Sequence, residues 1–315
     1  AIQSENILWL ADYYYDVLGL DTREARDTAD RELVTRTIGL LSPLLVEGKG
    51  LIASLQPEHE GEALKLVRLF EADGSYERAL DLANSLIERQ TEQPDLGWHL
   101  QHEALFELAS CYEHLGKREK ALETFAFINA SNERYPSSMS AVSLLESARL
   151  QYQLIANEPT DVKEQRVTPI LSALKELQIK KLAETEPLHL EAALDYATIR
   201  ADLEGSETRP SRYRFFLKRI REDFTNNDDT IVQAYRTALS AMPDKRHLFD
   251  AYMTFIEAEL LRSDALDLKA EQKLEEMEEV NEKALALYDE LKRGVSLPRE
   301  LAARIERSID AINAT

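Results

Sequence analysis

The sequence is poor in the residues that bridge, bend or anchor a chain. It contains one cysteine, Cys111, in 315 residues, which excludes an intramolecular disulfide and a zinc site built from several cysteines. Ten glycines and ten prolines leave few breaks, so the elements between them are expected to be long helices. No apolar run reaches the roughly 18–20 residues that cross a bilayer. These absences predict an all-helical chain without a transmembrane segment.

Basic charge is also in short supply. The chain has 38 Lys and Arg residues against 58 Asp and Glu, a net charge of −20. Contact with nucleic-acid phosphates needs a basic surface, so we expect no nucleic-acid partner, whereas an acidic surface favours basic or neutral partners. Phosphate-binding and catalytic signatures such as GxxxxGKS/T, HExxH, CxxC and GxSxG are absent. We therefore expect a protein that is not an enzyme and holds no cofactor and no metal.

What the sequence does contain is a repeated pattern. Residues 62–88 and 102–128 each show apolar residues at helical spacing, then a glycine, then a second apolar helical pattern. The glycine can end the first helix in a left-handed conformation, so each segment is predicted to form two antiparallel helices joined by a short turn. Matching positions in the two copies pair Val67 with Ala109, Phe70 with Tyr112, Gly74 with Gly116, and Ala79 with Ala121.

These positions resemble the tetratricopeptide repeat, whose pattern combines a small residue, an aromatic residue, a glycine turn and an alanine in the second helix. The copies here are 42 residues apart, whereas the family repeat is about 34 residues long, and neither keeps the family's Trp. Residues 134–152 resemble the start of a third copy. The "YPSS" found there is similar to long-repeat tetratricopeptide proteins of bacterial envelopes, such as outer-membrane assembly lipoproteins.

The resemblance implies an all-α fold, a right-handed α-α superhelix of antiparallel helix pairs. In that family the first helix of each repeat lines a concave groove that takes a peptide or helix of another protein. The matching groove positions here are Lys65, Arg68, Glu103, Phe106, Ser110, Glu113, His114, Leu145, Arg149 and Tyr152.

The charges of this expected groove disfavour one known use of the fold. Chaperone-binding members clamp a peptide's C-terminal carboxylate with Lys and Asn. Here only Lys65 and Arg68 suit that role, and Glu103 and Glu113 would repel a carboxylate. We expect a mixed groove, with apolar anchors such as Phe106 and Tyr152, that recognises a helix or an extended peptide.

Cys111 and His114 are three positions apart, so a thiolate–imidazole pair or one turn of the repeat would explain them. A reactive thiol needs an electropositive setting, and the neighbouring Glu107 and Glu113 supply the opposite. We interpret Cys111 as a buried structural residue. His114 falls near a predicted helix C-terminus, and we interpret it as a capping or groove residue.

Three further clusters have both a functional and a structural interpretation. His99, His102 and Glu103 could hold zinc or belong to a polar helix face. Trp9 and Tyr13 could form an aromatic ligand box, or a second contact of a helix whose core stripe is Leu10, Tyr14, Val17 and Leu18. The third cluster could grip an acidic peptide, a phosphate-rich ligand or anionic lipid, or could pack Phe215, Phe216 and Ile220 inward while its cations pair with acidic residues. Its basic members are Arg209, Arg212, Arg214, Lys218, Arg219 and Arg221.

The chain divides into three predicted regions. Residues 1–60 would cap the solenoid, residues 61–157 would form the tetratricopeptide-like repeats, and residues 158–315 would form a divergent helical region that ends in a long charged helix. The apolar stripe of residues 267–293 suits a helix that lies on a neighbour or pairs as a coiled coil. Pairing of this kind would give homo-oligomers through the C-terminal helix.

The leading hypothesis is a non-catalytic scaffold that binds another protein in the repeat groove. The alternatives are a bacterial cell-envelope or secretion assembly component, and an enzyme or small-ligand binder on a helical toroid. The chain does not begin with Met, so a removed signal or anchor would be invisible. Cytoplasmic and periplasmic or envelope-associated locations both fit.

Overall fold

A computed structural model describes most of the chain and contains thirteen α-helices in its described part. The chain divides into two compact units, Ala1–Leu150 and Gln151–Thr315, and each is described by itself. The described residues are 2–20, 26, 29–52, 56–91, 98–131, 139–180, 188–203, 209–225, 233, 237, 240, 243–294 and 297–314.

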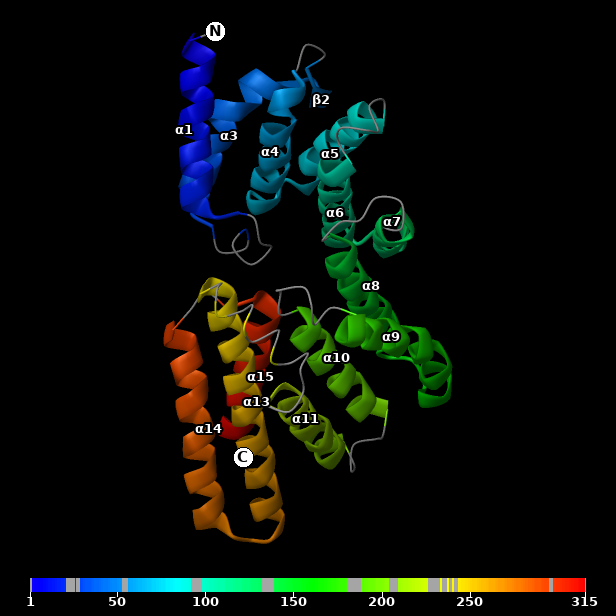
Figure 1. Cartoon of the computed structure of the whole chain (residues 1–315), viewed down its shortest axis with the longest axis vertical. Coiled ribbons are helices and arrows are strands. Elements are labelled where there is room, and N and C mark those ends of the chain that lie inside the picture. The colour runs from blue at the N-terminus through cyan, green and yellow to red at the C-terminus, as the bar shows by residue number, and fades with distance from the viewer. Residues whose placement is uncertain are drawn as a thin grey trace. The chain divides into compact units, whose positions relative to one another are not determined.

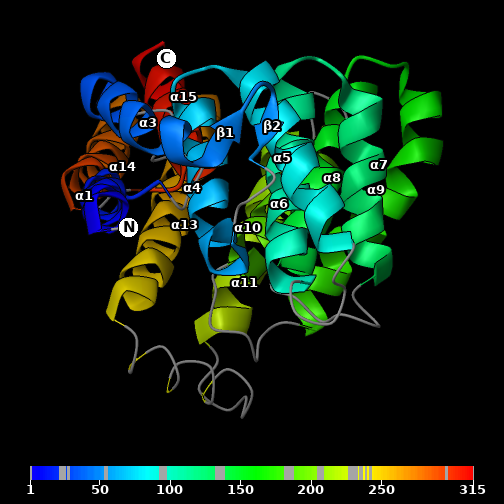
Figure 2. The same cartoon turned by 90° about the horizontal axis from the view of Figure 1, so that it is seen from above.

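The first unit is a series of helices in which neighbours in sequence pack on one another. Contacts join α1 to α3, α3 to α4, α4 to α5, α5 to α6 and α6 to α7, and Figures 1 and 2 show the successive helices side by side. Packing between sequence neighbours is the rule in helical repeats. The helices are α1 (Ile2–Leu18), α3 (Arg31–Leu45), α4 (Glu60–Ala72), α5 (Tyr76–Thr91), α6 (Trp98–His114), α7 (Arg118–Ser131) and the part of α8 (Met139–Ile155) up to Leu150.

The two predicted repeat copies fold as two equivalent helix pairs. Gly74 and Gly116 follow α4 and α6 with φ of +79° and +72°. The N–H of Ser75 donates to the carbonyl of Phe70, and the N–H of Lys117 donates to the carbonyl of Tyr112, both at 2.8 Å. This bond closes a helix that ends on a left-handed glycine. The predicted tetratricopeptide-like pairs are therefore confirmed by the same helix ending in both copies.

Packing follows the predicted register as well. Val67, Ala79, Ala109 and Ala121 are fully buried, and all four belong to one apolar core that runs from α1 to α8. Small residues at these positions let neighbouring helices approach closely. Between α3 and α4 the chain makes a two-residue antiparallel hairpin, β1 (Val46–Glu47) with β2 (Gly50–Leu51), and a short 3-10 turn, η1 (Pro57–His59).

The second unit is built in the same way around a separate core. Contacts join α9 to α10, α10 to α11, α11 to α13, α13 to α14 and α14 to α15. The core of this unit includes Leu194, Leu217, Tyr252, Phe255 and Tyr288. Its helices are α9 (Thr160–Lys180), α10 (Leu188–Leu203), α11 (Arg209–Thr225), α13 (Pro243–Ala270), α14 (Leu274–Gly294) and α15 (Arg299–Asn313).

The predicted continuous helix over residues 267–293 is wrong. The chain reverses at Gln272, which has φ of +62°, so α13 ends and α14 begins within that segment. Ala284, Tyr288 and Leu291 of α14 are buried in the core of the second unit, and α13 and α14 contact one another. The apolar stripe thus lies on a neighbour within the chain, which was one of its two predicted roles.

The all-α class is confirmed. No helix within the described ranges is both long and apolar enough to cross a membrane.

Candidate functional site

The predicted groove positions on α4 and α6 carry charges that are already paired. Nζ of Lys65 lies 2.7 Å from Oδ1 of Asp12 on α1. Arg68 donates from Nε to Glu107 at 2.7 Å and from Nη2 to Glu103 at 3.0 Å. Helices α1, α4 and α6 are therefore joined by ion pairs across the face that the sequence predicted to be a binding groove.

A second arginine completes this network from the segment between α1 and α3. Arg26 is 5% exposed. Its Nη1 and Nη2 donate to the two oxygens of Glu107 at 2.6 and 2.8 Å, its Nη1 also pairs with Glu71, and its Nε donates to the carbonyl of Leu20 at 2.9 Å. The planar guanidinium matches a carboxylate with two parallel bonds. We call Arg26, Arg68, Glu71, Glu103 and Glu107 the arginine–glutamate network.

The protonation states of the network follow from its geometry. Burial alone would raise the pKa of Glu107, but the charges of Arg26 and Arg68 and their hydrogen bonds outweigh burial and hold that pKa below its ordinary value. Glu107 accordingly stays ionised at neutral pH. The two arginines are held by carboxylates of the same chain, so the network ties helices together and does not act as a clamp for a peptide carboxylate.

The apolar anchors predicted for the groove are inside the protein. Phe106 is 8% exposed, and its ring centroid lies 5.7 Å from that of Phe125. Leu145 and Ser110 are fully buried. The expectation that Phe106 and Leu145 meet a partner is therefore corrected, because the repeat alignment fixes the position along a helix but does not show how closely the next helix covers it.

The remaining groove positions keep some exposure but have local partners. Arg149 pairs with Glu146 at 2.8 Å, and the hydroxyl of Tyr152 donates to Asp202 at 2.8 Å. Glu113 is half-buried and His114 is exposed. The imidazole of His114 stacks on Tyr76 of α5, with ring centroids 4.4 Å apart and planes 12° apart.

Cys111 and His114 do not form a catalytic pair. The thiol of Cys111 is buried and donates to Oε1 of Glu71 at 3.1 Å. Burial and the negative charge of Glu71 raise the pKa of this thiol far above its ordinary value, which leaves it protonated and unreactive. Nδ1 of His114 instead lies 2.9 Å from the carbonyl of Ser110. The predicted structural role of Cys111 is confirmed.

The predicted histidine cluster is dispersed among other contacts. Nε2 of His102 lies 2.9 Å from Oγ of Ser131, and Glu103 pairs with Arg68 at 3.0 Å. The side chain of His99 lies outside the described residues. Among the side chains that the structure describes, no group of three or more His, Cys, Asp or Glu is placed to hold a metal ion.

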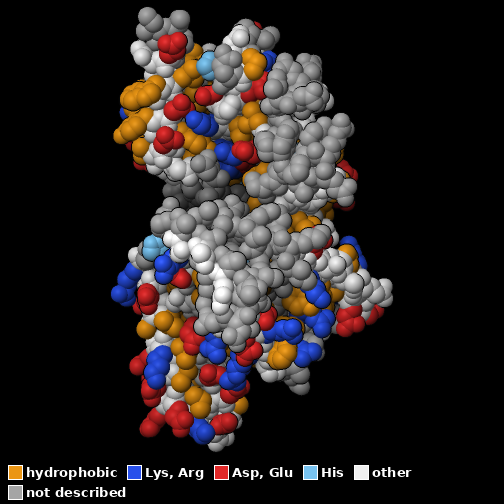
Figure 3. Space-filling model, viewed as in Figure 1, with side chains coloured by type: hydrophobic (Ala, Val, Ile, Leu, Met, Phe, Trp, Pro, Cys, Tyr) orange, Lys and Arg blue, Asp and Glu red, His pale blue; other side chains and the backbone are white. Residues whose placement is uncertain are grey.

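An exposed aromatic stripe lies on α1. Trp9, Tyr13 and Val17 are 69%, 54% and 60% exposed, and spacings of four residues put them on one face of the helix. The rings of Trp9 and Tyr13 are stacked with centroids 6.2 Å apart. Figure 3 shows hydrophobic side chains gathered along the outer side of α1. The prediction that Val17 belongs to the core is wrong, since Ala11 and Tyr15 provide the buried face. We call Trp9, Tyr13 and Val17 the α1 stripe.

The predicted basic cluster forms α11, and most of its cations have partners. Arg209 pairs with Asp202 at 2.7 Å and Arg221 with Glu257 at 2.8 Å, while Arg214 pairs with both Asp264 and Asp267. Arg219 lies 3.9 Å from Asp223 on the same helix.

The aromatic residues of α11 divide between the inside and the outside. Ile220 is buried, and Phe216 is half-buried against Tyr196. Phe215 is 51% exposed and lies beside Arg212, whose guanidinium carbon is 5.7 Å from the ring centroid. Lys218 is exposed. The inward packing predicted as the structural alternative is therefore correct for Ile220 and Phe216, and wrong for Phe215.

The role of Arg26 was not predicted from the sequence, because no local pattern indicates an ion pair with Glu107, which lies 81 positions later. The accessibility of the α1 stripe was not predicted either. The sequence does contain a pattern that indicates this stripe. Trp9, Tyr13 and Val17 are four residues apart, so they form a second apolar face next to the buried face of the same helix.

No family model matches the sequence, and no curated protein matches it. Among solved structures, the chain is similar to the nearly identical TPR-like repeats of a Podosopora anserina protein that is named after the kinesin light chain. The identity is 16%, the match covers 71% of this chain and 98% of that one, and the TM-score is 0.46.

A variant of the same Podosopora anserina protein matches at 17% identity over 70% of this chain and 95% of that one, again with a TM-score of 0.46. At this sequence identity and TM-score, the similarity does not indicate a function or a binding site for this chain. The assignment to tetratricopeptide-like helix pairs comes from the helix endings and the buried register of the chain itself.

Proposed function

We propose that this protein is a non-catalytic scaffold that binds a basic amphipathic helix of a partner protein at the α1 stripe. The observation that carries the proposal is the exposure of Trp9, Tyr13 and Val17 on one helix face. This exposed face of α1 is aromatic and apolar, and large exposed apolar patches mark interaction sites.

The position of the stripe on α1 fits a docking surface. Asp12 and Tyr15 face α4, where they contact Lys65 and Arg68. The α1 stripe is turned away from them, because neighbours on a helix are about 100° apart. Aromatic residues dominate the energy of protein interfaces, and a helix that lies along α1 would meet them at spacings of three and four residues.

Charge complementarity selects the kind of partner. Helix α1 carries Glu5, Asp12 and Asp16 and no Lys or Arg, and the whole chain has a net charge of −20. A partner helix with Leu or Phe on one face and Lys or Arg beside it would be attracted by this field. The buried state of Phe106 and Leu145 leaves the α1 stripe as the better source of apolar anchors than the central groove.

Fluorescence of Trp9 tests the proposal directly. In a Trp98→Phe background Trp9 is the one tryptophan, because the sequence has two. Titration with a synthetic amphipathic helix of leucine and lysine should shift its emission to the blue and saturate, and a scrambled peptide of equal composition should not. Tyr13→Ala with Val17→Ala should weaken binding about tenfold or more, as expected for interface hot spots. Phe127→Ala removes an exposed aromatic on α7 (56% exposed) and should change nothing.

Three results would contradict the proposal. If the scrambled peptide bound as tightly as the amphipathic helix, the binding would depend on the net charge of the peptide and not on its apolar face. Unchanged binding by the Tyr13 and Val17 variant would move the site elsewhere, for example to the groove around Lys65, Glu103 and His114. Loss of self-association in that variant, measured by light scattering, would make a second copy of this chain the occupant.

A photo-reactive residue placed at Tyr13, with a second placed at Phe127 as the control, extends the test to natural partners. The proposal requires crosslinked segments that carry net positive charge and helical apolar spacing, and requires them from position 13 and not from position 127. Crosslinks to acidic or extended segments would count against it.

A further inference from the structure

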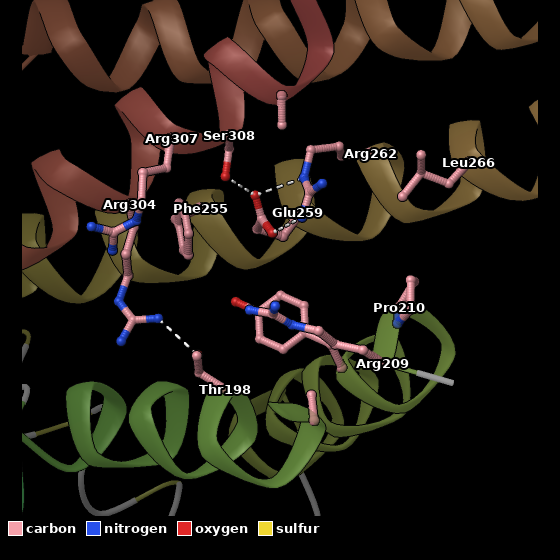
Figure 4. A pocket seen from close by; sticks show the side chains of 13 residues that line it. Thr198, Arg209, Pro210, Phe255, Glu259, Arg262, Leu266, Arg304, Arg307 and Ser308 are labelled. Carbon is pink, nitrogen blue, oxygen red and sulfur yellow. Dashed lines mark hydrogen bonds and ion pairs between the residues drawn. The ribbon is translucent and has the colours of Figure 1, made fainter. Parts of the chain in front are cut away.

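The second unit contains a cavity that the scaffold proposal does not use. It has a volume of about 340 Å³ and lies among α10, α11, α13 and α15. Figure 4 shows the lining side chains converging on its centre from these helices. Pockets that hold small ligands begin at about this volume. The cavity therefore has the size of a small-molecule site and not of a single buried water.

Its lining concentrates positive charge within an acidic protein. Arg209, Arg262, Arg304 and Arg307 line the cavity, and Glu259 is the carboxylate among its described lining residues. The chain as a whole has 20 more acidic than basic residues. Even when Asp195 and Asp202, which pair with Arg304 and Arg209, are added to the lining, four cations face three carboxylates. The net charge of the cavity lining is therefore positive, whereas the net charge of the chain is negative.

The carboxylate of Glu259 is fully engaged by its neighbours. Its Oε2 lies 2.9 Å from Nη2 of Arg262, and its Oε1 accepts hydrogen bonds from the hydroxyls of Tyr288 and Ser308. Glu259 is 2% exposed. Its charge is therefore largely offset where it sits, and Glu259 fixes Arg262 and Ser308 on the wall of the cavity more than it repels an anion.

The arginines of the cavity are held in position by ion pairs. Nη1 of Arg304 donates to Oγ1 of Thr198 at 3.0 Å, and Nη2 of Arg304 pairs with Asp195. A guanidinium has five N–H donors, so an arginine that is oriented by one carboxylate can bind a second anion. Figure 4 shows Arg304 on α15 and Arg209 on α11 among the side chains that line the cavity. Such preorganised, planar donors suit carboxylate and phosphate groups.

Part of the wall is apolar. Phe255 is buried, and Leu266, Ala201 and Ala311 also line the cavity. A site with convergent cations and an apolar wall fits a ligand that has an anionic head and a hydrocarbon or aromatic body. Inorganic phosphate alone would leave the apolar wall without a contact.

We propose that this cavity binds a small organic anion, with its carboxylate or phosphate group between Arg209 and Arg304 and its apolar body against Phe255 and Leu266. The anionic head accepts hydrogen bonds from the guanidinium groups. The hydroxyl of Ser308 stays with Glu259. Binding needs no change in the contacts that hold Arg262 and Arg304, so the site is formed before the ligand arrives.

Calorimetric titration of the full chain with phenyl phosphate, benzoate and inorganic phosphate tests the proposal. Phenyl phosphate or benzoate should bind saturably, and inorganic phosphate should bind at least about tenfold more weakly because it lacks the apolar contact. Arg209→Gln combined with Arg307→Gln should weaken binding of the organic anions about tenfold or more, because Arg209→Gln removes charge-assisted hydrogen bonds to the head group and Arg307→Gln removes a second positive charge from the lining. Both positions are exposed, so the variant is expected to fold.

A matched control separates the site from general charge. Arg219→Gln combined with Arg293→Gln makes the same change of charge at exposed positions that do not line the cavity, and binding should stay within about twofold of the unmodified chain. Leu266→Ala should weaken the organic anions and leave inorganic phosphate unchanged. An equal loss in both arginine variants would overturn the proposal, as would the absence of saturable binding of all three anions at millimolar concentrations. Circular dichroism of each variant shows that its helices are retained.

Discussion

At the scale of single residues, the arginine–glutamate network explains why buried charge is tolerated in the first unit. Glu107 is 1% exposed and Arg26 is 5% exposed, and an isolated charge at such a depth would be strongly destabilising. Two guanidinium groups bind the one carboxylate, so desolvation is offset by several charge-assisted hydrogen bonds. Removal of one partner leaves the others buried without their counter-charge.

We expect Glu107→Gln to lower the free energy of unfolding by about 3 kcal/mol, because Arg26 and Arg68 would then share a neutral amide in a buried site. Urea denaturation followed by circular dichroism measures the change. The matched control is Glu279→Gln, which breaks the exposed ion pair with Lys283 on α14 and should give no measurable change. A loss no larger than that of the control would contradict the structural role of the network.

The same variant should have a characteristic pH dependence. The pKa of Glu107 in the folded protein lies below its ordinary value of 4.5. Its contribution to stability is therefore complete above that value and is lost as the pH falls through the folded-state pKa. The stability difference between the unmodified chain and Glu107→Gln should be constant near neutrality and should narrow in acid. A difference that widens in acid would mean that the folded-state pKa is raised.

At the scale of helices and turns, glycine positions decide how much of the fold could be predicted. Gly74 and Gly116 marked two helix ends in the sequence, and both have positive φ in the structure. The turn between α13 and α14 has the same hydrogen bond, from the N–H of Lys273 to the carbonyl of Leu268 at 3.0 Å. There the left-handed residue is Gln272, which carries no such signal, so the helix was predicted to continue.

Gly116→Ala should lower the free energy of unfolding by roughly 1–2 kcal/mol, the cost of a left-handed conformation in a residue with a side chain. Gly61→Ala is the control, because Gly61 lies within α4 with ordinary φ and open space around its Cα. That change should be neutral or slightly stabilising. Thermal unfolding of both variants gives the comparison, and equal effects would show that the turn conformation is not responsible.

Gln272→Gly should act in the opposite direction and raise the free energy of unfolding by roughly 0.5–1 kcal/mol. Glycine relieves the left-handed strain but adds entropy to the unfolded chain, so the gain is smaller than the strain. Gln272→Ala keeps the strain and should not stabilise. Chemical denaturation that shows no gain for the glycine variant would mean that Gln272 has contacts that offset its backbone conformation.

The candidate sites were harder to predict than the helices because they depend on which helix covers which face. Helical spacing identified the groove positions on α4 and α6, but the cover over Phe106 comes from Phe125, 19 positions away in the sequence. The cavity of the second unit gathers residues between Thr198 and Ala311. No local pattern links arginines that far apart: Arg209 belongs to the basic cluster of α11, and Arg262, Arg304 and Arg307 belong to no motif.

At the scale of the whole molecule, the chain is two units with separate cores. The core of the first unit draws on α1 to α8 and that of the second on α10 to α15, and the two share no residue. In helical repeats, stability is close to a sum over neighbouring elements. A substitution that disrupts one core is therefore expected to lower the stability of its own unit more than that of the other unit.

Phe125→Ala tests whether a defect in the core of the first unit leaves the second unit intact. Phe125 is fully buried in the first unit, and its truncation should cost about 3–5 kcal/mol. Hydrogen exchange should increase in α5, α6 and α7 and stay unchanged in α13 and α14. The reciprocal variant, Phe255→Ala in the second core, should reverse the pattern. Equal loss of protection in both units would show that the chain unfolds as one cooperative body.

The arginine–glutamate network also has a consequence for how the chain is made. Ribosomes deliver residues in order, and Arg26 emerges long before Glu107, its partner 81 positions later. Until α6 has been synthesised, Arg26 can pair with Glu71 of α4 but lacks Glu107, which accepts two hydrogen bonds from its guanidinium group. The opening part of the chain is thus held back from completing its fold until the second repeat arrives, so the first unit would finish folding as a block during translation and not helix by helix.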